Sequence, residues 1–170
     1  ETNEVFFSRR WKEMLGYDEA YEINSLDEWE VRVHPDDKAP FYDGIYRHFD
    51  PEISPFYENE YRVLCKDNSY KWVLDRGKVV LWAHDRRPLR MIGTYMDITL
   101  RKIAEQQLQL SSRVFSETNE GIIITNAKGI ITDVNPAFCE ITGYNSESII
   151  GQKPSVLNSG KQSPGFYKEM

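Results

Sequence analysis

The sequence predicts an α+β protein, in which an antiparallel sheet with flanking short helices is followed by a long connecting helix and a second, related unit. Residues 8–17 align without a gap with 135–144, and the two segments share an aromatic residue, a glutamate two positions later and a Gly-Tyr pair. Residues 57–97 contain runs of alternating apolar and polar positions, which is typical of strands. Residues 99–119 contain neither Gly nor Pro and carry apolar residues at helical spacing. We therefore expect two tandem domains of one family, since the repeat is too widely spaced for a solenoid.

Three short helices are predicted before the sheet, after a short strand over 5–7. The helices are expected over 9–15, from Ser25 to Val33, and over 38–49. Ser25 and the acidic residues after it are typical of a helix start, and Pro35 ends that helix because it displaces the preceding residue from the α region. Either Asp36 or Asp37 is expected to cap the third helix.

An antiparallel meander is predicted to follow these helices. Its three strands are expected at 57–65, 70–82 and 89–97. Tyr57, Tyr61, Val63 and Cys65 fall on one face of the first strand, whose other face is charged. Residues 66–69 have the composition of a hairpin turn.

The connecting helix is expected over 99–119. Within it, Ala104, Leu108, Ser111 and Phe115 alternate four and three apart, as in a coiled-coil seam. The second unit then begins with a tight hairpin of strands over 122–125 and 130–134, followed by the repeated helix. The expected domains are a first domain over 1–98, a linker helix over 99–119 and the N-terminal half of a second domain over 121–170.

Composition narrows the functions that are open to the chain. With 40% hydrophobic and 28% charged residues it is typical of a globular protein, and no window approaches the roughly 18 apolar residues of a membrane span. The net charge of −6 argues against a nucleic-acid partner, because phosphate binding requires a basic surface. Cys65 and Cys139 lie far apart and are expected to be reduced, which favours a cytoplasmic location. The chain opens on Glu1 without a signal peptide, so we expect it to be part of a longer protein.

Several motifs in combination resemble the PAS superfamily of the PAS–PAC type. In the first unit there are three such motifs. The first covers residues 25–29 and 33–37, the second covers residues 61–63, 67–73 and 76–77, and the closing element covers residues 93–99. In the second unit they occupy 121–125, 135–138 and 143–144, followed by a tail over 151–170. Together they cover nearly the whole chain. The first domain lacks the strand that begins the family fold, and the second stops before its own meander.

The resemblance implies a sensory and interaction module of a multidomain, bacterial-type signal-transduction protein, without catalytic activity of its own. It further implies a small-molecule ligand as one form of input, an unknown cofactor, and an output domain absent from this chain. The tail over 151–170 favours a cyclic-dinucleotide synthase or phosphodiesterase as output, with a histidine kinase as the alternative. A homodimer is expected, formed through the linker helix or by pairing of the second unit's hairpin with a partner chain. A purely structural dimerisation module stays open as an alternative.

A haem-binding gas sensor is a further alternative, because His48 lies in a helix that resembles the one carrying the axial histidine in haem-binding PAS domains. We expect instead that His48 lies on a solvated helix face. His34, His48 and His84 show no metal-ligand spacing with one another or with a cysteine. Neither Cys65 nor Cys139 has the neighbours that the reactive cysteine of the flavin-type photosensors has.

No catalytic residue is predicted, because the sequence shows no nucleophile–base pair. Gly160-Lys161 is the nearest approach to a phosphate-binding loop. It fails because Gln162 replaces the magnesium-binding Ser or Thr and Ser155 replaces the first glycine.

Four aromatic residues are candidates for a ligand site. Trp11, Tyr61, Trp72 and Tyr95 are predicted to line a cavity for a flat molecule, although aromatic residues on strands also serve as plain core.

Asp97 and Thr99 are the candidates for signal relay. They lie where the last strand ends and the connecting helix begins, so either side chain is placed to cap the new helix. A change in the strand would then change the direction of the helix.

Overall fold

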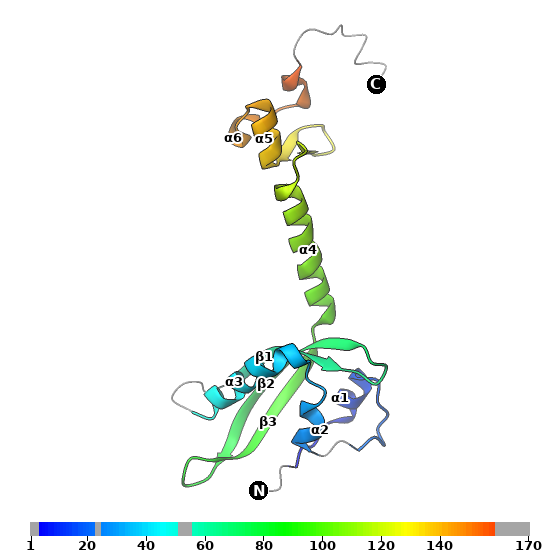
Figure 1. Ribbon diagram of the computed structural model, residues 1–170, viewed down its shortest axis with the longest axis vertical. Helices are drawn as coiled ribbons and strands as arrows, with labels where there is room; N and C mark the ends of the chain where they lie inside the picture. The colour runs from blue at the N-terminus through cyan, green and yellow to red at the C-terminus, as the bar shows by residue number, and fades with distance from the viewer. Residues whose placement is uncertain (1–3, 23–24, 51–55, 159–170) are drawn as a thin grey trace. The chain divides into compact units, whose positions relative to one another are not determined.

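The computed structural model describes residues 4–22, 25–50 and 56–158, and Figure 1 labels its elements. The chain forms two compact units that divide between Ala104 and Glu105. The first unit contains α1 (Arg9–Met14), α2 (Leu26–Glu30), a 3₁₀ turn (Pro35–Asp37), α3 (Lys38–His48), β1 (Tyr57–Leu64), β2 (Tyr70–Trp82) and β3 (Pro88–Asp97). Helix α4 (Thr99–Glu117) begins in the first unit and continues into the second. The second unit adds β4 (Ile123–Thr125), β5 (Ile131–Val134), α5 (Pro136–Thr142), α6 (Ser146–Ile149) and a 3₁₀ turn (Pro154–Leu157).

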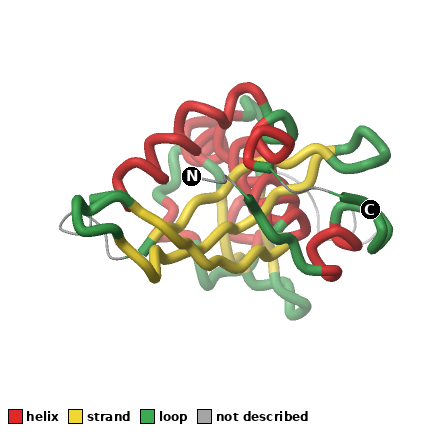
Figure 2. The backbone as a smooth tube through the Cα atoms, turned by 90° about the horizontal axis from the view of Figure 1, so that it is seen from below, coloured by secondary structure: helices red, strands yellow, loops and turns green. Residues whose placement is uncertain are grey.

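The sheet of the first unit is the predicted antiparallel meander, with strand order β1-β2-β3. Figure 2 draws the strands in yellow. Tyr61 on β1 lies opposite Val73 on β2, which in turn lies opposite Asp97 on β3. Residues at alternate positions share a face, and we call the face that carries Tyr61 and Val73 the inner face and its opposite the outer face.

The core of the first unit lies between this inner face and the helices. Trp11 from α1, Trp29 from α2 and Phe41 from α3 pack with Tyr61 and Val73 in one buried cluster. The strand pattern predicted from the sequence is confirmed, since Tyr57, Tyr61, Val63 and Cys65 are all buried.

The sequence repeat is confirmed as a structural repeat. Ser8 and Asn135 occupy the same place in the two units, and each side chain caps its helix by accepting a backbone hydrogen bond three residues on. The aromatic residues at the matching positions, Trp11 and Phe138, are both buried. The helices end at glycines with positive φ, 82° at Gly16 and 75° at Gly143, a conformation that glycine adopts without strain.

Two local predictions for the first unit are wrong. No strand forms over 5–7, and the residue before this segment, Glu4, makes only an isolated bridge with Ser25. Asp37 precedes α3 but its side chain makes no capping bond. Its carboxylate instead accepts hydrogen bonds from the backbone and guanidinium of Arg62 at 2.7–2.8 Å, because the outer face of β1 brings that cation within reach.

Candidate functional site: the junction of the sheet with α4

Asp97 and Thr99 both hold the start of α4, but by different bonds. Asp97 Oδ1 accepts a hydrogen bond of 2.9 Å from the backbone N–H of Thr99, one of the amide groups that the helix itself leaves unpaired. Thr99 Oγ1 accepts a hydrogen bond of 3.0 Å from the backbone N–H of Trp72 on β2. The backbone N–H of Ile98, between them, donates to the carbonyl of Trp72 at 2.9 Å. The first residue of α4 is thus bonded directly to the central strand.

A lysine on β2 adds charge to this arrangement. Lys71 Nζ lies 3.0 Å from Asp97 Oδ2, and both side chains are about one third exposed. Partial burial acts to raise the pKa of Asp97, but hydrogen bonds from Thr99 and Lys71 outweigh it and hold the pKa below its ordinary value. Asp97 therefore stays ionised near neutral pH, as a helix start favours.

Strand β1 reaches the same turn of α4 through Glu60. Its carboxylate lies 2.7 Å from Lys102 Nζ and also pairs with the guanidinium of Arg101. Hydrogen bonds from Lys102 and Arg101 hold the pKa of Glu60 below its ordinary value. Lys102 also lies over the indole of Trp72, with Nζ 5.2 Å from the ring centroid, within the range of a cation–π contact.

We refer to Glu60, Trp72, Asp97, Thr99 and Lys102 together as the junction. It contains one residue from each of the three strands and two from the first turn of α4. A displacement of any strand relative to the others therefore changes a bond to α4. The sequence analysis found Asp97 and Thr99 but missed Glu60 and Lys102, whose partnership joins segments far apart in the chain.

The four predicted cavity-lining aromatics do not come together. Trp11, Tyr61 and Tyr95 belong to the core on the inner face, whereas Trp72 lies on the outer face, opposite Arg62 and between that residue and Lys102.

The three core aromatics pack against a common neighbour. The ring centroid of Trp29 lies 5.3 Å from that of Trp11, 5.9 Å from that of Tyr61 and 5.3 Å from that of Tyr95. These are the distances of close aromatic packing, so the rings fill the space between the helices and the sheet with one another.

A buried carboxyl group lies beside this aromatic cluster and was not anticipated. Asp75 on β2 is 5% exposed and accepts a hydrogen bond of 2.8 Å from the hydroxyl of Tyr61. Tyr95 lies opposite it on β3. Burial raises the pKa of Asp75 to about 6, although the hydrogen bond from Tyr61 acts in the other direction. Its only signal in the sequence was an acidic residue directly after the apolar run of residues 72–74 in β2.

His48 is buried, so the expectation of a solvated helix face is wrong. Its side chain is 2% exposed at the end of α3, and Nε2 accepts a hydrogen bond of 3.0 Å from the backbone N–H of Val79. Helix α3 turns the His48 side chain toward Val79 on β2. Within the described parts of the chain, no three His, Cys, Asp or Glu side chains are grouped so as to hold a metal ion.

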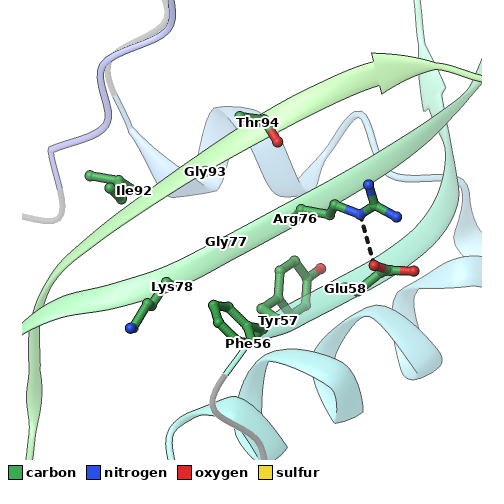
Figure 3. A pocket seen from close by; sticks show the side chains of 9 residues that line it. All are labelled: Phe56, Tyr57, Glu58, Arg76, Gly77, Lys78, Ile92, Gly93 and Thr94. Carbon is green, nitrogen blue, oxygen red and sulfur yellow. Dashed lines mark hydrogen bonds and ion pairs between the residues drawn. The ribbon is translucent and has the colours of Figure 1, made fainter.

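A shallow hollow of about 430 Å³ lies over the sheet (Figure 3), and no junction residue lines it. Its lining residues are Phe56, Tyr57, Glu58, Arg76, Gly77, Lys78, Ile92, Gly93 and Thr94. Lys78 Nζ lies 5.3 Å from the ring centroid of Phe56, and Arg76 pairs with Glu58 at 2.7 Å. Gly77 and Gly93 face each other, and a Cβ on Gly93 would lie 2.8 Å from the carbonyl oxygen of Arg76. None of the predicted cavity-lining aromatics contributes to this hollow.

We expect Asp97→Ala to lower the free energy of unfolding of the first unit by about 0.5–2 kcal/mol, the usual effect of losing a side chain that caps a helix start. Thermal or urea unfolding followed by tryptophan fluorescence measures this unit by itself, because all four tryptophans lie within it. Asp43→Ala, on the exposed side of α3, is the matched control. An Asp97→Ala variant that unfolds with the midpoint of the parent would contradict a capping role.

Three kinds of comparison place this fold among known proteins. Residues 4–95 match the family described as PAS fold, and residues 109–170 match a second PAS fold family. A crystal structure of a sensory box histidine kinase/response regulator from Burkholderia thailandensis is similar with a TM-score of 0.58 and 30% identity, over 66% of this chain and 81% of that chain.

Among curated proteins, a nitrogen fixation regulatory protein from Klebsiella pneumoniae is 32% identical over 68 residues, which cover 40% of this chain and 14% of that protein. An uncharacterized protein of Sinorhizobium fredii is 32% identical over 108 residues, which cover 64% of this chain and 12% of that protein. The chain thus matches only a small part of the length of these relatives. No helix in the described residues has the length and apolar character needed to cross a membrane. With its antiparallel sheet, its repeated capped helix and these matches, the chain belongs to the PAS family, as one PAS sensor domain followed by part of a second.

Proposed function

We propose that this chain is the sensory part of a larger signal-transduction protein and that it relays a change in the first PAS domain through α4 to the second. The observation that carries the proposal is the junction, where each strand of the first sheet is bonded to the first turn of α4. The relatives support it, since one is a sensory box histidine kinase/response regulator and another a nitrogen fixation regulatory protein.

The relay requires two arrangements of the sheet that differ in free energy and that an input favours unequally. Thr99, Glu60 and Lys102 translate such a difference into the direction of α4, because they fix its first turn to different strands. A helix of 19 residues spans about 28 Å, so a small change of direction at its start becomes a displacement of several ångströms at its end.

The proposed domain organisation is the one expected from the sequence, with a first domain over 1–98, a linker helix over 99–119 and the N-terminal half of a second domain over 121–170. We propose that the chain has no catalytic activity of its own and works in the cytoplasm. The enzymatic output, a histidine kinase or a cyclic-dinucleotide enzyme, would lie elsewhere in the protein. The similar Burkholderia protein is a histidine kinase/response regulator, which favours the kinase.

A homodimer formed along α4 is part of the proposal. No residue of α4 is buried, and Leu108, which belongs to the seam expected from the sequence with Ala104, Ser111 and Phe115, is exposed. Apolar residues in such a seam gain free energy when a second helix covers them, and a second copy presents the same seam.

Leu108→Pro tests the relay and Leu108→Ala is its matched control. Proline in the middle of a helix removes a backbone hydrogen bond and breaks it, whereas alanine preserves the helix and removes only the exposed leucine side chain. We expect Leu108→Pro to abolish the response of the output to the input in the full-length protein, and to leave the fluorescence-detected unfolding of the first domain unchanged. Leu108→Ala should keep the response and weaken self-association in sedimentation experiments.

Loss of the first domain's cooperative unfolding in Leu108→Pro would show that α4 is a structural part of that domain. A full response in Leu108→Pro would remove the continuous helix from the mechanism.

A small-molecule ligand of the first domain is supported by a buried polar atom in its core. Trp11 Nε1 has no hydrogen-bond partner in the described structure, which is costly unless a polar molecule reaches it. Native mass spectrometry of the purified chain reports such a ligand and the oligomeric state together. The haem alternative has less support, because His48 Nε2, a ring nitrogen able to bind iron, already accepts the Val79 hydrogen bond.

A further inference from the structure

We propose that Asp75 and the three tyrosines around it form a proton-responsive element in the first domain, and that gain or loss of the Asp75 proton is an input to the relay. The inference rests on the proposed relay through α4 and names one signal that drives it.

The setting of Asp75 is unusual for a carboxyl group. It lies on the inner face at the middle of β2, opposite Asn59 on β1 and Tyr95 on β3, and 5% of it is exposed. The titratable groups that face it are Tyr57 and Tyr61 from β1 and Tyr95 from β3. The helices that cover this part of the core contribute the aromatic rings Trp11, Trp29 and Phe41. No cation within the described ranges forms an ion pair with it.

Neutral hydroxyl groups are therefore the groups that stabilise its negative charge. Tyr61 donates at 2.8 Å, and burial raises the pKa of Asp75 to about 6 despite this bond. The group consequently changes charge in a range of pH that cells reach.

The two protonation states require different hydrogen bonds. The carboxylate accepts only, and in the structure the Tyr61 hydroxyl donates to it. The protonated acid carries one O–H donor and needs an acceptor, and the oxygens within its cluster belong to the tyrosines. Protonation therefore forms or reverses at least one hydrogen bond between β2 and a neighbouring strand. Because the core is close-packed, we infer that the strands shift to accommodate the new hydrogen-bond geometry.

Each strand that touches Asp75 continues directly into the junction. Tyr95 lies two residues before Asp97 on β3, and Tyr61 follows Glu60 on β1. On β2, Asp75 lies three residues after Trp72, whose backbone bonds Thr99. Two residues of a strand span about 7 Å, so a shift within the Asp75 cluster is transmitted to the bonds that hold α4.

The test is a titration of the whole chain followed by carbon-13 and nitrogen-15 NMR from about pH 4.5 to about pH 8. The side-chain carboxyl of Asp75 is expected to titrate with a midpoint of about 6. The backbone amide signals of Thr99 and Lys102 are expected to shift with the same midpoint. The junction carboxylates cannot produce this signal, since the pKa values of Glu60 and Asp97 are lowered rather than raised.

Three variants make the assignment specific. Asp75→Asn should abolish the common midpoint at Thr99 and Lys102, whereas His48→Gln, at the buried histidine of α3 that bonds Val79 on β2, should leave it in place. Tyr61→Phe should raise the midpoint by about one pH unit, because it removes a donor to the charged form. This shift remains measurable if Asp75→Asn fails to fold.

A carboxyl midpoint below about 4.5 overturns the proposal, since Asp75 would then titrate as an ordinary aspartate. A midpoint near 6 that Thr99 and Lys102 do not follow also overturns it, because the proton would not reach α4. Neither result would contradict the proposed relay through α4, which the Leu108→Pro variant tests separately.

Discussion

Trp29→Ala is expected to lower the free energy of unfolding of the first domain by about 3–5 kcal/mol, the range for deleting a large buried aromatic ring. Trp29 is 3% exposed and lies at the centre of the aromatic cluster, with ring contacts to Phe7, Trp11, Tyr61 and Tyr95. These neighbours come from helices, strands and an extended segment, so collapse into the space left by the indole would require all of them to move. The expected loss is of the same order as the whole stability of many domains.

Urea unfolding followed by the fluorescence of the three remaining tryptophans measures this loss. Trp82→Ala provides the matched control, because Trp82 is only half-buried near the end of β2 and lies outside the aromatic cluster. We expect the control to cost clearly less. Equal losses at the two positions would show that the cluster around Trp29 is not the part of the core that stabilises the domain.

Asp75→Asn is expected to stabilise the first domain near neutral pH and to have little effect near pH 4. In the unfolded chain an aspartate has a pKa near its ordinary value of 3.8, and in the folded domain that of Asp75 is raised to about 6. Between these values the folded state holds a proton that the unfolded state has released, so stability falls as pH rises through this window. A difference of about two pKa units corresponds to about 3 kcal/mol, which the neutral asparagine does not lose.

The comparison must be made as a difference between variant and parent at each pH. Asp37, Glu60 and Asp97 have lowered pKa values in the folded state, so they contribute stability that is lost as pH falls. These contributions are common to both proteins and cancel in the difference. A difference in unfolding free energy that stays constant from pH 4 to pH 7 would show that Asp75 is ionised in the folded domain as readily as in the unfolded chain.

The helices and strands could be predicted from the sequence because the signals that define them are local. Ser8, Ser25 and Asn135 are capping residues immediately before their helices, and a cap depends on atoms within three residues of it. The alternation in β1 and the absence of Gly and Pro in α4 are equally local. The repeat revealed two related domains for the same reason, since both copies encode the same capped helix ending at a glycine with positive φ.

The junction and the surroundings of Asp75 could not be predicted in full from the sequence, because they depend on contacts between residues that are far apart in the chain. The alternation in β2 places Trp72 and Val73 on opposite faces, but only the helices that cover the sheet decide that Val73 is buried and Trp72 meets Lys102. The packing of the helices on the sheet also turns His48 toward Val79, and it encloses Asp75 among tyrosines from the two other strands. The sequence by itself thus determined the elements, their order and the family, because these follow from backbone propensities within a few residues. The tertiary structure decided which polar side chains are buried and which charges meet α4, because both depend on residues brought together from distant parts of the chain.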